Sequence, residues 1–111
     1  MIADGAGIFA PVRRCERVQP IAPDTGAVVG DTIEPQTEQA LENVRSVLAE
    51  ADASLSDVIE VQVFLVDADD FPGLDAAYAE VMPKPYPARS AFEVDGLAAD
   101  VRVEIEAVAM V

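Results

Sequence analysis

The sequence contains no histidine, no tryptophan and only one cysteine. Without histidine or a cysteine pair, this inventory excludes a Ser-His-Asp triad, a Cys-His dyad and a zinc site. The chain also has no glycine-rich phosphate loop of the Walker or dinucleotide type. Carboxylates, arginines, tyrosines, hydroxyls and backbone amides remain for chemistry, so no metal and no cofactor is expected.

Positive charge is scarce as well. Seven Lys and Arg stand against twenty-one Asp and Glu, which gives a net charge of −14. Nucleic-acid binding depends on clustered cations, so no nucleic-acid partner is expected. The basic cluster of Arg13, Arg14 and Arg17 is interpreted as a solvated loop rather than a binding patch. A site for a small anion must therefore carry its own cation, and Arg89 is the obvious one outside that cluster.

Long apolar runs are missing too. No run reaches the ~18 residues that span a membrane, and the first residues lack the cationic and apolar stretches of an export signal. Cys15 cannot form an internal disulfide and has no histidine base, so it is interpreted as an unreactive thiol. These features predict a cytoplasmic protein with no membrane partner.

The composition that is present is typical of a small globular domain. Apolar residues make up 51% of the chain, and 111 residues predict one domain over residues 1–111. A chain of this size buries roughly 65% of its unfolded surface, which is enough for a single core. At its N-terminal end the pattern predicts two short strands, residues 7–10 and an edge strand at residues 12–18.

The first predicted helix has a clear start and a clear apolar stripe. Asp31 or Thr32 is expected to cap it, because Pro35 then falls in the first turn, where its missing N–H is not needed. Asp52 is expected to end it in a left-handed conformation. Apolar residues recur along it at three- and four-residue steps: Ile33, Ala40, Leu41, Val44, Val47, Leu48 and Ala51.

Residues 58–66 predict a strand with almost no polar break. Ile59, Val61, Val63 and Leu65 alternate with a second set that is itself mostly apolar. A sheet with one face in water would alternate more cleanly. The chain has only two helices to cover its sheet, so a second subunit is expected to cover the other face.

The remaining elements complete an α+β pattern. A second helix is predicted from Asp69 or Asp70 to Val81, and strands are predicted at residues 88–94 and 101–110. The order ββαβαββ predicts a mixed or antiparallel sheet with two helices packed on one face.

One charged pair in the last two strands suggests chemistry. Pro87-Ala88-Arg89-Ser90 feeds one strand, and Glu104 follows fifteen residues after the arginine in the next. We expect these two strands to be adjacent. A planar guanidinium meets a carboxylate with two parallel hydrogen bonds. A glutamate beside it could move a proton, so Arg89 and Glu104 are candidates for holding a small carboxylate and transferring a proton.

The order and spacing of several segments resemble the Rid proteins, the reactive intermediate deaminases also called YjgF-like. The matching segments are Gln36–Val44, Leu48–Val58, Val63–Asp67 with Asp70-Phe71, Tyr78, Pro87–Ser90, Gly96-Leu97 and Val103–Ala107. They run from about Pro23 to the C-terminus. The resemblance implies a chorismate-mutase-like fold and a homotrimer whose ligand pockets lie between subunits.

The resemblance also implies an activity and its residues. Family members hydrolyse 2-imino acids to 2-keto acids and ammonia. In this chain the substrate carboxylate would be bound by Arg89 and the backbone amide of Ala91, and Glu104 would act on the attacking water. The chain departs from the family near Glu16–Gln19, where a Ser-Gly-Gln segment is usual, and at Asp75, where an asparagine is usual.

Three further interpretations remain open. The same trimer could bind a keto acid or another small carboxylate without turnover, or it could act on enamine or amino-muconate substrates. A ribonuclease or translation inhibitor is disfavoured by the net charge of −14 and the missing histidine. Among single residues, Tyr78 is expected in the core, and Tyr86 either on the surface or in the ligand pocket. Family members usually carry a Gly-Pro-Tyr-Ser segment whose tyrosine reaches into that pocket. This segment is missing here, and Phe9 is a candidate to replace its aromatic ring.

Overall fold

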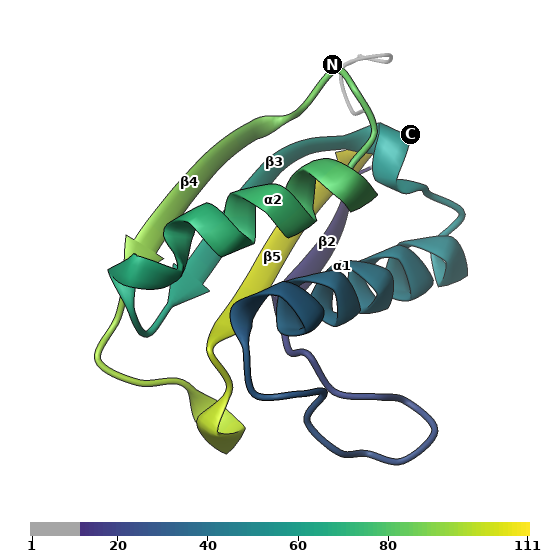
Figure 1. Cartoon of the computed structure of the whole chain (residues 1–111). Coiled ribbons are helices and arrows are strands. Elements are labelled where there is room, and N and C mark those ends of the chain that lie inside the picture. Colours follow the sequence, from purple (N-terminus) through teal and green to yellow (C-terminus); the bar gives the residue numbers. More distant parts are fainter. Residues whose placement is uncertain (1–11) are drawn as a thin grey trace.

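A computed structural model describes residues 12–111 as four strands and two α-helices (Figure 1). The predicted strand at residues 7–10, and with it Phe9, lies outside the described residues. The elements are β2 (Val12–Val18), α1 (Ile33–Glu50), β3 (Val58–Leu65), α2 (Phe71–Val81), β4 (Ala88–Glu93) and β5 (Val103–Met110). The sheet has the order β2-β5-β3-β4, and only the β3–β4 pair is parallel.

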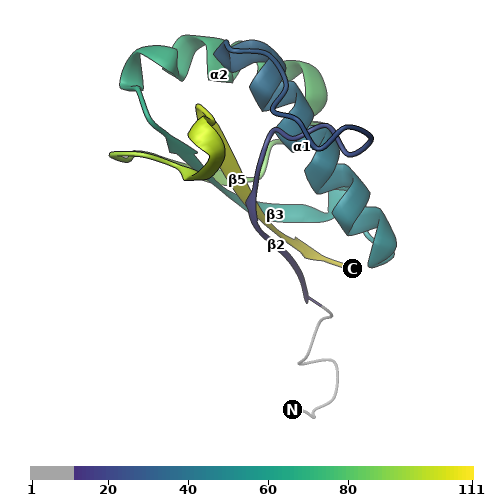
Figure 2. The same cartoon turned by 90° about the horizontal axis from the view of Figure 1, so that it is seen from below.

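Both helices lie on one face of this mixed sheet (Figures 1 and 2). The core lies between the two layers, where Leu41, Leu48, Leu65, Leu74 and Ile105 are almost completely buried. This is the predicted α+β fold class. Among residues 12–111, no helix has both the length and the apolar character needed to cross a membrane.

Helix α1 follows the predicted pattern with one exception. Thr32 is its N-cap in an extended conformation, and Asp52 adopts the expected left-handed conformation just beyond its end, with φ of 61°. Val47 was predicted in the apolar stripe of this helix, but it is 47% exposed. The polar residues Gln36 and Thr37 are buried instead, and the apolar periodicity gave no sign of them.

Strand β3 contains a local irregularity that the alternation did not predict. Its pairing with β5 shifts register between Val58 and Glu60. As a result Val58 is buried, whereas Ile59 is 48% exposed, unlike Val61, Val63 and Leu65, the other members of its alternating set. From Val61 onward the alternation holds, because register fixes which face each side chain takes.

The later elements are confirmed with small differences at their ends. Helix α2 begins at Phe71 after a short 3-10 turn at Ala68–Asp70, and the last strand begins at Val103 instead of residue 101. Helix α2 connects β3 to its parallel neighbour β4, as a parallel pair requires a crossover.

Within residues 12–111, no helix or strand covers the face of the sheet that points away from the helices (Figure 2). We call it the outer face. It carries the ring pair of Phe64 and Phe92, whose centroids lie 5.8 Å apart. Phe92 is 46% exposed. The expectation that a second subunit covers this face stays a prediction.

Candidate active site

Arg89 lies in β4, paired with Val61 of β3, and its side chain points toward α2. It lines a pocket of about 360 Å³ together with Asp75, Tyr78, Ala79, Tyr86 and Pro87. Tyr86 therefore lines the pocket of Arg89, which was one of the two places expected for it. We call this the Arg89 pocket.

The guanidinium of Arg89 is held by one ion pair and two aromatic rings. Its Nη2 donates to Asp75 Oδ1 at 2.7 Å, and its Cζ lies 4.8 Å from the ring centre of Tyr78 and 5.6 Å from that of Phe71. Rings of this kind attract a cation and limit its movement. The ion pair is partly solvated, since the Arg89 and Asp75 side chains are 24% and 50% exposed.

Ala91 offers a backbone donor at the open edge of the sheet. Strand β4 is an edge strand, and the amide of Val94 donates to Leu65 O of β3 at 2.7 Å. Backbone N–H groups alternate in direction along a strand, so the amide of Ala91 is directed away from β3. Such an unpaired edge amide can bind a ligand or another chain.

Glu104 lies on the outer face of β5, directly opposite Phe64 of β3. It is 4% exposed, and both of its carboxylate oxygens accept hydrogen bonds. Arg17 Nε donates to Oε1 at 2.9 Å, and Gln19 Nε2 donates to Oε2 at 3.1 Å. Buried carboxylates need such partners, because an unpaired buried charge is strongly destabilising.

The expectation that Arg89 and Glu104 lie on adjacent strands is wrong. Strand β3 lies between β4 and β5, and the two side chains point to opposite faces of the sheet. The cause is topological: the crossover through α2 places β4 on one side of β3, and β5 pairs with the other side. Within one chain this arginine and this glutamate do not share a pocket.

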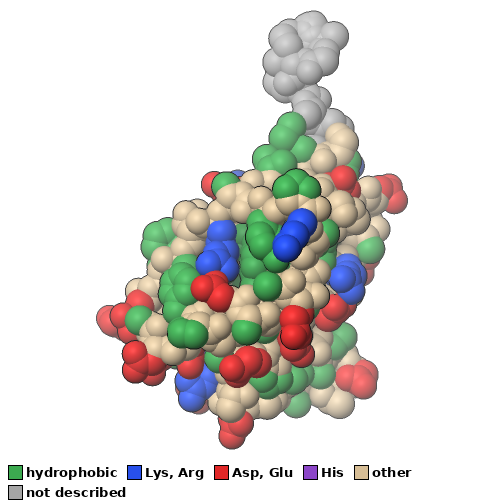
Figure 3. Space-filling view, turned by 45° about the horizontal axis from the view of Figure 1, so that its top comes forward, with side chains coloured by type: hydrophobic (Ala, Val, Ile, Leu, Met, Phe, Trp, Pro, Cys, Tyr) green, Lys and Arg blue, Asp and Glu red, His purple; other side chains and the backbone are tan. Residues whose placement is uncertain are grey.

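The N-terminal arginines are also not a solvated loop. They lie on β2, where Arg13 Nε donates to Ala51 O at 2.7 Å and Arg17 binds Glu104. Arg14 lines a small pocket on the outer face with Glu60, Gln62, Glu106 and Val108. Figure 3 shows a face on which acidic groups are widespread and the basic groups stand apart from one another.

Burial raises the pKa of two titratable groups. Burial raises the pKa of the Cys15 thiol above its ordinary value of 9.0. Burial also raises the pKa of Tyr78, while nearby Arg89 acts in the opposite direction and Tyr86 adds a smaller increase. A protonated, buried thiol is a poor nucleophile. Tyr78 is in the core as expected, and its hydroxyl has no hydrogen-bond partner within the described residues.

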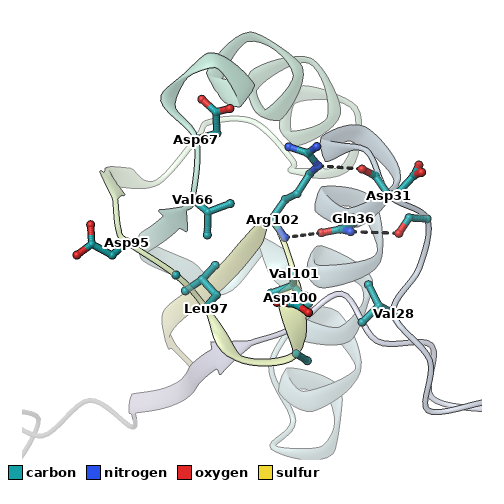
Figure 4. A pocket seen from close by; sticks show the side chains of 13 residues that line it. Val28, Asp31, Gln36, Val66, Asp67, Asp95, Leu97, Asp100, Val101 and Arg102 are labelled. Carbon is teal, nitrogen blue, oxygen red and sulfur yellow. Dashed lines mark hydrogen bonds between the residues drawn. The ribbon is translucent and has the colours of Figure 1, made fainter.

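A pocket of about 660 Å³ lies elsewhere, between the β4–β5 connection, the loop before α1 and the end of β3 (Figure 4). Asp31, Asp67, Asp95 and Asp100 line it. Its one cation, Arg102, is already bound by Asp31 O at 2.8 Å and Asp70 Oδ2 at 2.9 Å. It therefore suits a small anion poorly. No group of three His, Cys, Asp or Glu side chains within residues 12–111 is arranged for a metal ion.

Comparison with known proteins identifies the family. The sequence profile described as Endoribonuclease L-PSP matches residues 18–111. The 2-iminobutanoate/2-iminopropanoate deaminase of Salmonella typhimurium is 38% identical over 94 residues, covering 82% of this chain and 73% of that protein. The chain is a member of the Rid family. A RutC family protein of Pyrococcus horikoshii is 48% identical over 90 residues, covering 81% of this chain and 71% of that protein.

Solved structures agree with this assignment. The crystal structure of RidA from the Antarctic bacterium Psychrobacter sp. matches this Rid chain with a TM-score of 0.88 at 29% identity, covering 93% of this chain and 83% of the other. Yeast Mmf1 matches with a TM-score of 0.85 at 31% identity, covering 95% and 88%. The predicted fold and family are confirmed.

Sequence reasoning missed three partners of the candidate residues. Arg17 and Gln19, which bind Glu104, fall in the segment where the family pattern is lost, and that departure was the available signal. Asp75, which binds Arg89, was recognised only as a replacement for asparagine. Roles in substrate binding for Arg89 and Ala91, and in catalysis for Glu104, stay predictions.

Proposed function

We propose that this Rid protein hydrolyses reactive 2-imino acids to 2-keto acids and ammonia. The observation that carries the proposal is the Arg89 guanidinium, which faces a pocket and is backed by the rings of Tyr78 and Phe71. Relatives named reactive intermediate deaminase support the reaction class, among them a chloroplastic protein of Arabidopsis thaliana that is 37% identical over 89 residues.

Substrate capture begins with the carboxylate of the imino acid. Arg89 donates to it, and the edge amide of Ala91 supplies a further donor. Asp75 competes for the same guanidinium, but an exposed ion pair is worth only about 0–1 kcal/mol. A charge-assisted contact with the substrate contributes about 1.5–3 kcal/mol. The substrate carboxylate can therefore displace Asp75 from Arg89, or bind the guanidinium beside it.

Glu104 then acts on water. The oxygen of a water molecule bonds to C2 while Glu104 takes one of its protons, and the imine nitrogen is protonated. Glu104 then gives its proton to the resulting amine nitrogen, the C2–N bond breaks with its electron pair on nitrogen, and ammonia leaves. The C2 hydroxyl releases its proton to solvent as it becomes the keto oxygen. General acid–base help of this kind contributes about 10²–10⁴-fold to the rate.

The two residues would come from different protomers. In one chain they lie on opposite faces, so a shared site requires the β4 edge of one protomer to meet the outer face of another. The exposed ring of Phe92 on that face and the edge amide of Ala91 support a homotrimer with sites between subunits. A cytoplasmic location also stays a prediction, since relatives include proteins named chloroplastic and mitochondrial.

The test is an imine-loss assay on the purified protein. The imine is generated in place by an amino-acid oxidase or dehydratase, and its decay is followed with the wild type, Arg89→Ala and Glu104→Gln. Arg89→Ala should raise KM by about 10- to 150-fold, and Glu104→Gln should lower kcat by about 10²–10⁴-fold. Arg45→Ala and Glu106→Gln are matched controls, because Arg45 pairs with Glu42 on α1 and Glu106 lies on the face of β5 that carries Glu104.

The alternative is a trimer that binds keto acids without turnover. It is favoured by the side chains of Arg17 and Gln19, which occupy both oxygens of Glu104. Binding of 2-oxobutanoate by calorimetry, with imine decay no faster than in buffer, would select this alternative. An RNA-directed activity has no comparable support, because the net charge is −14.

A further inference from the structure

Arg17 holds a backbone conformation that residues with a side chain rarely adopt. Its φ is 48°, in the left-handed region. It lies at the irregularity of β2, where the pairing with β5 shifts register between Cys15 and Val18. A residue other than glycine keeps such a conformation only when its surroundings stabilise it, and such positions cluster at functional sites.

The consequence of this conformation is a contact on the outer face. The side chain of Arg17 reaches Glu104, with Nε 2.9 Å from Oε1, and its Cζ lies 4.2 Å from the ring centre of Phe64. Glu104 is nearly buried, whereas half of the Arg17 side chain is exposed. The arginine therefore lies between the carboxylate and solvent.

The second oxygen of Glu104 is fixed by a chain of hydrogen bonds from α1. Gln19 donates to Oε2, and the backbone of the same loop is held by Asn43, whose Nδ2 donates to Gln19 O at 2.9 Å and to Ile21 O at 2.8 Å. Gln39 in turn donates to Asn43 Oδ1 at 2.9 Å. Arg17 at the end of β2 and Gln19 just after it thus hold one carboxylate oxygen each.

We propose that Arg17, with Gln19, is a positioning residue that orients the Glu104 carboxylate toward the attacking water. This inference rests on the proposed function. It extends that function to Arg17, which the sequence analysis placed in a solvated loop, and to Gln19. Each carboxylate oxygen can accept about two hydrogen bonds. Arg17 and Gln19 take one each, so one acceptor position on each oxygen remains for water.

The left-handed backbone allows a clean experiment. Arg17→Gly removes the side chain and relieves the backbone at the same time, so loss of fold is not expected. Arg17→Asn tolerates the same conformation. Arg17→Lys retains a charge but lacks the planar fork. Arg14→Ala is the matched control, because Arg14 is a cation on the same strand that has no contact with Glu104.

In the imine-loss assay, Arg17→Gly and Arg17→Asn should lower kcat by about 10- to 100-fold with KM within about twofold of the wild type. Arg17→Lys should recover part of the loss, and Arg14→Ala should match the wild type. Circular dichroism and thermal unfolding check that each variant is folded. A folded Arg17→Gly protein with wild-type kcat would overturn the positioning role.

The same assay separates this inference from the proposed function. If Arg89→Ala and Glu104→Gln lose activity while Arg17→Gly keeps it, the deaminase stands and the role of Arg17 is wrong. If the wild type does not accelerate imine loss, the proposed function is wrong, and the positioning role of Arg17 is overturned with it. A change in KM alone would also contradict positioning, because it would indicate a role in substrate binding.

Discussion

Arg89 Nη2 lies 2.7 Å from Asp75 Oδ1, and this ion pair joins β4 to α2 at the pocket where a substrate carboxylate is expected. The carboxylate of Asp75 thus occupies a donor that the proposed function requires. Because the pair is partly solvated, we expect it to weaken the binding of anions by Arg89 without blocking it.

Replacing Asp75 by asparagine should strengthen binding of small carboxylates. Asp75→Asn removes a competing negative charge from Arg89, so the Kd for 2-oxobutanoate measured by calorimetry is expected to fall about two- to fivefold. Glu42→Gln is the control, since it makes the same change of charge at the exposed Arg45 pair. Equal tightening in both variants would mean that net charge alone is responsible.

Removing the hydroxyl of Tyr78 should not destabilise the protein. That hydroxyl is buried and has no hydrogen-bond partner among residues 12–111, and an unsatisfied buried group costs about 1–3 kcal/mol in the folded state. Tyr78→Phe keeps the ring beside Arg89 and is expected to raise the free energy of unfolding by about 1 kcal/mol in urea titrations. A loss of more than about 1 kcal/mol would show that the hydroxyl has a partner.

The same residue predicts a loss of stability at alkaline pH. Burial raises the pKa of Tyr78 in the folded state, so the folded protein binds this proton more tightly than the unfolded chain. The resulting stability is present below the ordinary value of 10.0 and is lost as pH rises through the folded pKa. Urea titrations from pH 8 to 11 should show a steeper decline in the wild type than in Tyr78→Phe.

Cys15 is expected to react with thiol reagents only when the protein opens. It is 2% exposed, its Sγ lies 3.9 Å from Val44 O, and burial raises its pKa. Labelling by iodoacetamide at pH 7.5 should be far slower than for the chain in denaturant, and it should accelerate with added urea. Rapid labelling without denaturant would place the thiol at an accessible position.

The outer face gives a test of assembly. Phe92→Asp places a charge on an exposed ring position of that face and should convert a trimer of 11.7 kDa chains to monomers without loss of fold. Val47→Asp is the control, because Val47 is equally exposed on α1 and away from the sheet. Sedimentation of the wild type as a monomer would remove the basis for a site between protomers.

Much of the fold could be predicted because local rules act on neighbouring residues. The repeat of Ala40, Leu41, Val44 and Leu48 specified a helix face, and the left-handed conformation of Asp52 followed from its place at the helix end. The same rules failed at Ile59, because a register shift depends on how β3 pairs with β5 and has no signature in the alternation itself.

By itself the sequence determined the two-layer α+β pattern, the candidate side chains Arg89 and Glu104, and, through its resemblance, the family. The tertiary structure decided what those side chains contact: Asp75 for the arginine, Arg17 and Gln19 for the glutamate. The physical reason is that strand order and strand face follow from long-range pairing. Because the chain crosses over through α2, β3 lies between β4 and β5. Only the assembled sheet therefore shows that Arg89 and Glu104 point to opposite faces.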